Sequence, residues 1–146
     1  QISASPPRYE LSYENNKNGR SYGLEIASDW QVRDTILLNF SYTYLHNDIN
    51  QSEWFADSGA PRNMISVRSL WDLTSKLDFD LWLRYVDNVP EKKVSSYTTL
   101  DARLAYRMTD KLELAIVGQN LFEDGHQEFS ELEVDRSIYA KIDWQF

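Results

Sequence analysis

The 146-residue chain contains no cysteine, so it can form neither a disulfide nor a thiolate metal site. It also lacks an excess of basic residues. The formal net charge is −8, which argues against nucleic-acid binding, because a polyanion is bound by Lys and Arg. No apolar run approaches the length of a membrane-spanning helix, although 42% of the residues are hydrophobic. Since there is no initiator methionine or signal peptide, we expect Gln1 to begin a processed product or an excised piece.

The hydrophobic residues follow an alternating pattern that is typical of β-strands. The pattern is clearest in residues 77–86, where Leu, Phe and Tyr alternate with mainly charged residues. We find no convincing helix. Eight strands of about ten residues are predicted, the length that a tilted strand needs to cross a bilayer. They cover residues 8–15, 21–32, 35–46, 63–73, 77–87, 97–108, 112–122 and 132–146.

The connections between these strands alternate in length. Residues 33–34, 74–76 and 109–111 form tight turns, whereas longer polar loops cover residues 47–62, 88–96 and 123–131. The first connection, 16–20, falls on the loop side but is short, and its Asn-Gly pair is a hairpin signal. Strands that run up and down place all tight turns at one end, as in outer-membrane barrels. The connections therefore favour an antiparallel up-and-down barrel.

The aromatic residues occupy defined positions on the apolar face of these strands. Trp30, Trp71, Trp144 and Tyr106 lie next to the tight turns, whereas Tyr42, Tyr44 and Tyr85 lie toward the loops. Two such groups are typical of the aromatic girdles of a membrane barrel. A β-sandwich with an aromatic core is the alternative. A sandwich core prefers Val, Ile and Leu, however, and its loops need not alternate in length.

The opposite face is strongly charged. In a membrane barrel it would line the lumen, and in a soluble protein it would be the solvated face; periodicity does not separate the two. The charged residues on this face are Glu25, Asp29, Arg68, Asp78, Asp80, Arg84, Asp101, Arg103, Arg107, Glu113, Lys141 and Asp143. The girdles and the alternating connections favour the membrane barrel. We predict an all-β fold: an antiparallel up-and-down transmembrane β-barrel of about eight strands.

Five short motifs follow one another along the chain: Asn18–Glu25, Ala60–Asn63, Tyr97–Arg103, Gly118–Asp124 and Tyr139–Phe146. The third reads Y-x-x-L-D-x-R and the fourth contains N-L-F. The last ends the sequence on an apolar strand face. In this order the motifs resemble the barrel of TonB-dependent outer-membrane receptors, from about residue 9 to Phe146. Lys141 departs from the terminal strand of that family, in which glycine is common at this position.

The resemblance implies a single segment, residues 1–146, that matches the last eight strands of a barrel of about 22 strands. The plug domain would be absent. The parent protein would import a scarce ligand such as a ferric siderophore, a cobalamin or a glycan, and the fragment alone would not transport. Its partners would be outer-membrane lipid, the remaining strands and plug, and the barrel assembly machinery. That machinery would read Tyr139, Trp144 and Phe146.

Candidate ligand contacts lie in the longest loop and on the polar face. Trp54 and Phe55 are aromatic residues of the 47–62 loop, near Arg62, and exposed loop aromatics often mark recognition sites. They could instead pack on a neighbouring loop or dip into lipopolysaccharide. Trp82 and Arg84 point to the predicted lumen, where Trp82 could stack on a ligand or fill space between lumen side chains.

Metal binding and catalysis have weak support. His126 lies beside Glu123 and other acids, but the only other histidine, His46, is not at ligand spacing, so a solvated loop is expected. Asp78 and Asp80 share a face like paired catalytic carboxylates, and nearby arginines offer an ion-pair explanation. The sequence contains no phosphate loop and no G-x-S-x-G. We expect no enzyme activity, metal or cofactor.

Two other proteins would fit the pattern. One is a stand-alone eight-stranded outer-membrane barrel with a structural or adhesive role, because eight strands can close around their own side chains. The other is a soluble β-barrel that carries a small ligand, in which the apolar face would be the interior. The second would fold without detergent.

Overall fold

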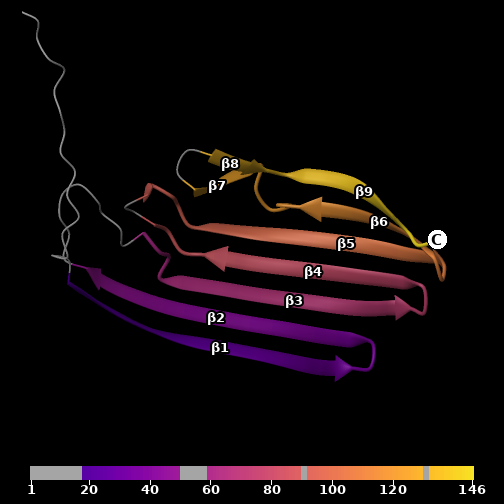
Figure 1. Cartoon of the computed structure of the whole chain (residues 1–146), viewed down its shortest axis with the longest axis horizontal. Helices are drawn as coiled ribbons and strands as arrows, with labels where there is room; N and C mark the ends of the chain where they lie inside the picture. Colours follow the sequence, from indigo (N-terminus) through magenta and orange to yellow (C-terminus); the bar gives the residue numbers. More distant parts are fainter. Residues whose placement is uncertain (1–17, 50–58, 90–91, 130–131) are drawn as a thin grey trace, which may run out of the picture.

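The computed structural model describes residues 18–49, 59–89, 92–129 and 132–146. They form a seven-stranded antiparallel sheet in the order β1-β2-β3-β4-β5-β6-β9, and a separate hairpin of β7 and β8 (Figure 1). None of the described segments is a helix long and apolar enough to cross a membrane. The strands are β1 (Gly19–Arg33), β2 (Ile36–Ile49), β3 (Asn63–Thr74), β4 (Leu77–Val86), β5 (Tyr97–Thr109), β6 (Leu112–Gln119), β7 (Gly125–Phe129), β8 (Leu132–Asp135) and β9 (Ser137–Trp144).

Strand register confirms the two predicted faces. Residues that lie opposite one another on paired strands point to the same side of a sheet. One row across β2 to β5 is apolar, with Phe40, Val67, Leu83 and Leu100. The adjacent row points to the other side and is polar, with Asn39, Arg68, Trp82 and Asp101. Each face is therefore continuous across the sheet, and the alternation along each strand decides which side chains share it.

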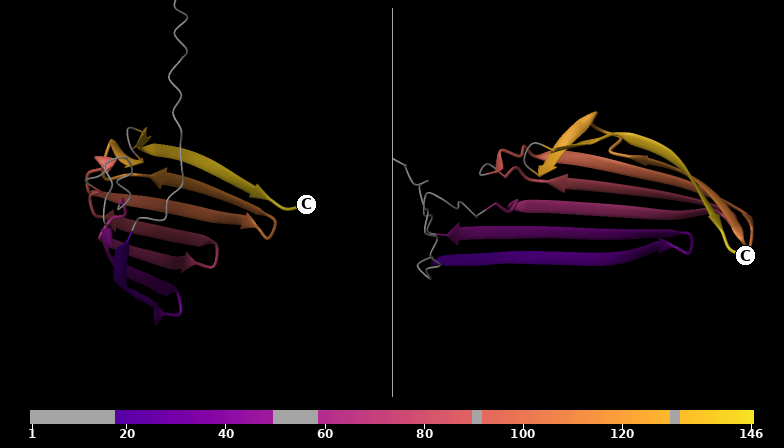
Figure 2. Two further views of the ribbon diagram at one scale, coloured as in Figure 1. Left: turned by 60° about the vertical axis from the view of Figure 1, so that its left-hand side comes forward. Right: turned by 45° about the horizontal axis from the view of Figure 1, so that its top comes forward.

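The two ends of the sheet differ, as the connections predicted. The tight turns at residues 34–35, 75–76 and 110–111 lie at one end, together with the C-terminus (Figure 1). The longer connections and the β7–β8 hairpin lie at the other. The sheet is twisted and curved rather than flat (Figure 2). β1 and β9 form its two edges, so the described residues make an open sector of a barrel.

Large hydrophobic side chains are exposed on the apolar face. Exposed fractions reach 54% for Leu24, 69% for Ile142 and 69% for Trp144. The buried Ala105 and Ala115 lie opposite each other on the polar face of β5 and β6. A water-exposed sheet would not leave such a surface uncovered, whereas a lipid-facing one does. The soluble carrier would instead bury this face in its interior.

Two predicted elements differ in the structure. The predicted last strand, 132–146, is divided at Arg136 into β8 and β9, and the loop 123–131 carries β7. The predicted strand 112–122 ends earlier, at Gln119, because Asn120 has a φ of 55°, in the left-handed region. The predicted strand at 8–15 lies outside the described residues. The main sheet thus contains seven of the eight predicted strands.

Candidate functional site

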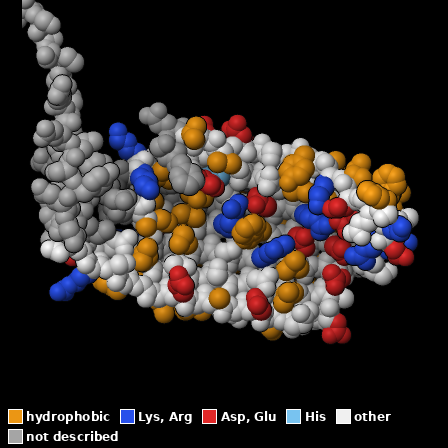
Figure 3. Space-filling view, in the orientation of Figure 1, with side chains coloured by type: hydrophobic (Ala, Val, Ile, Leu, Met, Phe, Trp, Pro, Cys, Tyr) orange, Lys and Arg blue, Asp and Glu red, His pale blue; other side chains and the backbone are white. Residues whose placement is uncertain are grey.

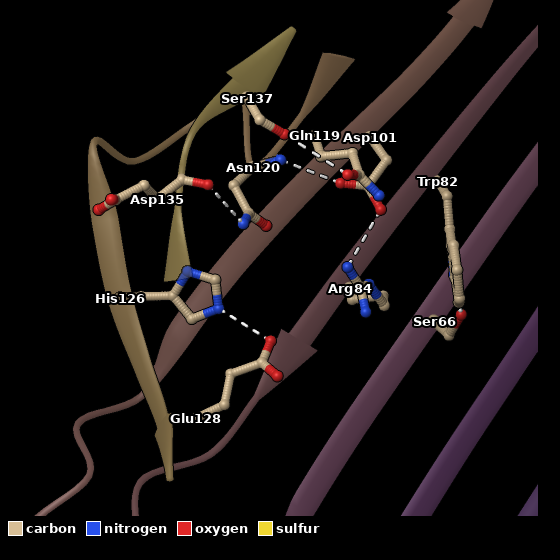
Figure 4. Close-up of polar contacts among 10 residues, drawn as sticks. All are labelled: Ser66, Trp82, Arg84, Asp101, Gln119, Asn120, His126, Glu128, Asp135 and Ser137. Carbon is tan, nitrogen blue, oxygen red and sulfur yellow. Dashed lines mark hydrogen bonds and ion pairs between the residues drawn. The ribbon is translucent and has the colours of Figure 1, made fainter. Parts of the chain in front are cut away.

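Trp82 and Arg84, the two ligand contacts predicted on the lumen face, contact each other at the polar face of β4. The Arg84 guanidinium carbon lies 4.4 Å from the centroid of the Trp82 ring, within range of a cation–π interaction. The Trp82 indole N–H donates a hydrogen bond of 2.7 Å to the Ser66 hydroxyl on β3. The structure therefore joins an aromatic surface and a cation, and the hydroxyl holds the indole in place (Figure 4).

Asp101 links this pair to the next strands. Arg84 Nη2 lies 3.1 Å from Asp101 Oδ2, and the backbone N–H of Asn120 donates to Asp101 Oδ1 over 3.0 Å. The Asn120 amide Nδ2 donates in turn to the backbone carbonyl of Asp135, at 3.2 Å. A chain of polar contacts therefore runs from β4 through β5 to the base of the β7–β8 hairpin (Figure 4).

Sequence reasoning did not single out Asn120. It is buried and follows β6 directly, in the left-handed backbone region that asparagine tolerates better than most residues. The motif 118–124 contained the signal, because an asparagine directly after a strand often ends it. What the sequence did not reveal was that the side chain reaches Asp135.

His126 is buried, which contradicts its prediction as a solvated loop histidine. Its ring stacks on Tyr97, with ring centroids 4.3 Å apart, and its Nε2 lies 3.0 Å from Glu128 Oε1. An adjoining hollow of about 320 Å³ is lined by Ser95, Ser96, Tyr97, Glu123, Gly125, His126, Gln127 and Glu133. Within the described ranges, no group of three or more His, Asp or Glu side chains could hold a metal ion.

Ion pairs occupy the rest of the polar face toward the tight turns. Arg103 lies 3.2 Å from Asp80 and also pairs with Glu113, and Arg107 lies 3.3 Å from Asp78. These contacts confirm that Asp78 and Asp80 pair with arginines of a neighbouring strand. Figure 3 shows acidic and basic side chains intermingled over this part of the sheet. A hollow of about 180 Å³ between the two groups of residues includes Arg68, Trp82 and Arg103 in its lining.

The remaining predicted loop contacts do not join Trp82 and Arg84. Trp54 and Phe55 lie outside the described residues. Arg62 is exposed just before β3, where its backbone carbonyl accepts a hydrogen bond from Leu45. Its charge also acts weakly on Asp87, whose pKa is lowered mainly by a hydrogen bond from the Asn63 side-chain amide. Arg62 thus belongs to the loop end, apart from the pair on β4.

The C-terminal residues lie on the edge strand β9. Trp144 is on the apolar face opposite Leu112, and Tyr139 is on the polar face opposite Val117. Phe146 follows the strand and is fully exposed. The predicted face of Trp144 is confirmed, and Tyr139 shares the polar face with Lys141 and Asp143.

The chain is similar in sequence to known outer-membrane proteins. The family model for the β-barrel of TonB dependent receptor-like proteins matches residues 1–121. The iron-regulated outer membrane virulence protein of two Vibrio cholerae serotype O1 strains is 25% identical over 154 aligned positions. These cover 96% of this chain and 23% of the Vibrio proteins, so the chain spans less than a quarter of their length.

A solved structure has the same fold. The siderophore receptor PiuA from Acinetobacter baumannii matches with a TM-score of 0.71 and 18% identity, over 89% of this chain and 22% of that one. An open antiparallel sheet with an uncovered apolar face, tight turns at one end and loops at the other agrees with these matches. The chain belongs to the TonB-dependent receptor β-barrel family and forms part of a receptor barrel in the bacterial outer membrane.

Proposed function

We propose that the chain is the C-terminal sector of an uptake receptor for anionic ferric chelates of the siderophore class. The contact that carries this proposal is that between Arg84 and Trp82, which presents a cation on an aromatic surface at the lumen face. Ferric complexes of catecholate and carboxylate chelators are anionic, so a guanidinium suits them. The names of the Vibrio and Acinetobacter proteins support iron over cobalamin or glycan, the other two ligand classes of the resemblance.

We further propose that residues 1–146 form one barrel segment and that the other strands and the plug belong to the parent receptor. Among the described strands, β1 and β9 are unpaired edges, which is consistent with this, since a membrane barrel has to close to satisfy its backbone groups. The segment by itself is not expected to transport. Ligand contact would come from Trp82 and Arg84, with Arg62, Trp54 and Phe55 contributing from the loops.

Iron uptake tests the ligand class. The full-length receptor, expressed in a strain without other iron receptors, is given radioactive iron as a tris-catecholate chelate, as a tris-hydroxamate chelate or as citrate, with labelled cyanocobalamin as comparison. We expect Arg84→Gln to raise the KM for the anionic chelates about tenfold, the equivalent of one charge-assisted hydrogen bond. Arg84→Lys should retain part of the affinity, because it keeps the charge. Uptake of cyanocobalamin alone, or of the uncharged tris-hydroxamate chelate alone, would overturn the proposal.

We also propose that Tyr139, Trp144 and Phe146 are read by the barrel assembly machinery. Replacing Phe146 with Ala should lower the amount of assembled receptor in the outer membrane several-fold, because an exposed aromatic at the end of the edge strand is lost. Heat-modifiable gel migration of outer-membrane fractions measures this amount. Phe122→Ala is the matched control, since Phe122 is also an exposed aromatic but lies after β6. Equal yields for the two variants would contradict an assembly role of Phe146.

A further inference from the structure

The β7–β8 hairpin folds back over the polar face of the sheet. Tyr97 and Asp101 lie on the same face of β5, four residues apart, and the His126 ring of β7 stacks on Tyr97. The hairpin is closed at its base, where Arg136 donates its backbone N–H to the carbonyl of Asp124 and its guanidinium pairs with the Asp124 carboxylate at 2.8 Å. Its position therefore depends on contacts with the barrel wall as well as on its own strand pairing.

Asp101 is bound from both sides. One carboxylate oxygen accepts from Arg84, the proposed ligand contact, and the other accepts from the backbone N–H of Asn120. Asn120 then holds β8 through the Asp135 carbonyl. Because one carboxylate serves both partners, a change at Arg84 alters the orientation and charge environment of the group that fixes the hairpin base.

Three buried side-chain polar atoms near the hairpin lack a hydrogen-bond partner within the part of the chain that the structure describes. Within the described residues, the buried side-chain atoms without a hydrogen-bond partner are Arg84 Nε, Thr99 Oγ1 and His126 Nδ1. Arg84 and Thr99 are opposite each other in register, and Thr99 follows Tyr97, the stacking partner of His126, by two residues on the same face. They belong to Arg84, to the residue opposite it on β5 and to the histidine by which the hairpin packs on the wall.

We propose that Asn120 is a positioning residue that couples occupation of Arg84 to the position of the β7–β8 hairpin, and that the hairpin thereby shapes the receptor mouth. This inference rests on the proposed function, because it takes Arg84 as the contact for an anionic group. An anionic oxygen bound to the Arg84 guanidinium competes with the Asp101 carboxylate for it. The displaced carboxylate then binds the backbone N–H of Asn120 less firmly, and the hairpin is released. The hollow beside Ser95 and His126 changes with it.

A spin-label distance measurement tests this coupling without any ligand. In the full-length receptor, labels are placed at Glu133→Cys on the hairpin and Glu25→Cys on the polar face of β1; both are exposed, and this chain supplies no other cysteine. We expect a narrow distance distribution in the parent protein. Asn120→Ala should broaden it and shift it to longer distances, because the amide contact is lost and alanine is strained in the left-handed region.

Two further variants separate the components. Asn120→Gly keeps the backbone conformation and its N–H to Asp101 but loses the contact to Asp135, so an intermediate broadening is expected. Arg84→Gln, which leaves the hairpin sequence intact, should also broaden the distribution. Asp78→Asn is the control, because it breaks an ion pair with Arg107 near the tight turns and should change nothing.

The outcomes are distinct. A parent-like distribution in Asn120→Gly and Asn120→Ala would overturn the positioning role, and a parent-like distribution in Arg84→Gln would overturn the coupling. If Asn120→Ala does not fold, Asn120→Gly and Arg84→Gln still decide. The spin-label distances are measured without a ligand, so they do not depend on whether the receptor takes up iron. In the same way, a hairpin that does not move would not change the outcome of the uptake experiment.

Discussion

Replacing Leu81 with Arg is expected to lower the free energy of unfolding of the lipid-embedded receptor by about 2–4 kcal/mol. Leu81 lies in the middle of β4 on the apolar face, opposite Ser69 of β3 and Ala102 of β5. A guanidinium there would sit near the middle of the hydrocarbon layer, where the cost of a charge is largest. Reversible folding of the receptor into lipid vesicles at increasing urea concentrations, followed by tryptophan fluorescence, measures this difference.

Asp80→Asn is the matched control, because Asp80 is the preceding residue on the other face of β4. It pairs with Arg103, which keeps Glu113 as a second partner after the substitution. The expected cost is below about 1 kcal/mol, as for a partly solvated ion pair. If both substitutions destabilised the receptor equally, the assignment of the apolar face to lipid and the polar face to the lumen would be wrong.

Most of the main sheet could be predicted because its strands alternate strongly. In β4, the leucines, Phe79 and Tyr85 alternate with residues that include two aspartates and an arginine, so a shift of one residue would put charges into lipid. The same contrast fixes the face of each residue in β9. Strand ends were less certain, because their limits depend on single residues such as Asn120, whose left-handed backbone ends β6.

The β7–β8 hairpin could not be predicted because its sequence lacks that contrast. β7 reads Gly-His-Gln-Glu-Phe, with polar residues at successive positions and no apolar face. Its position comes from tertiary contacts, such as the stacking of His126 on Tyr97, between residues 29 positions apart in the sequence. Local periodicity carries no information about such a contact.

The candidate site was predicted in part. Alternation placed Trp82 and Arg84 on one face, but their partners depend on the register between β4 and β5. That register is not set by a tight turn, because residues 87–96 separate the two strands. The pairing of Arg84 with Asp101 therefore required the structure. In contrast, the turn at 110–111 is tight and places Thr109 opposite Leu112. The register then shifts between Arg107 and Thr109, so the opposition of Arg107 and Glu113 also required the structure.

Arg103→Gln is expected to destabilise the receptor by about 2 kcal/mol, the second large effect, because removing one partner leaves charges uncompensated. Arg103 bridges Asp80 of β4 and Glu113 of β6, and the three side chains are 32%, 18% and 25% exposed. The expected cost is below that of a fully buried pair, since water screens part of the charge. The same urea titration in lipid vesicles measures it.

A second substitution identifies the cause. If the cost comes from the two carboxylates left on the wall, adding Glu113→Gln to Arg103→Gln should restore part of the stability, which a double-mutant cycle measures. Arg68→Gln is the control, because Arg68 is exposed on the same face and takes part in none of the ion pairs of the described residues. Its expected effect is within about 0.5 kcal/mol. If Arg103→Gln destabilised the receptor no more than Arg68→Gln, water alone would compensate the charges on the polar face. The ion pairs across β4, β5 and β6 would then contribute little to the stability of these strands.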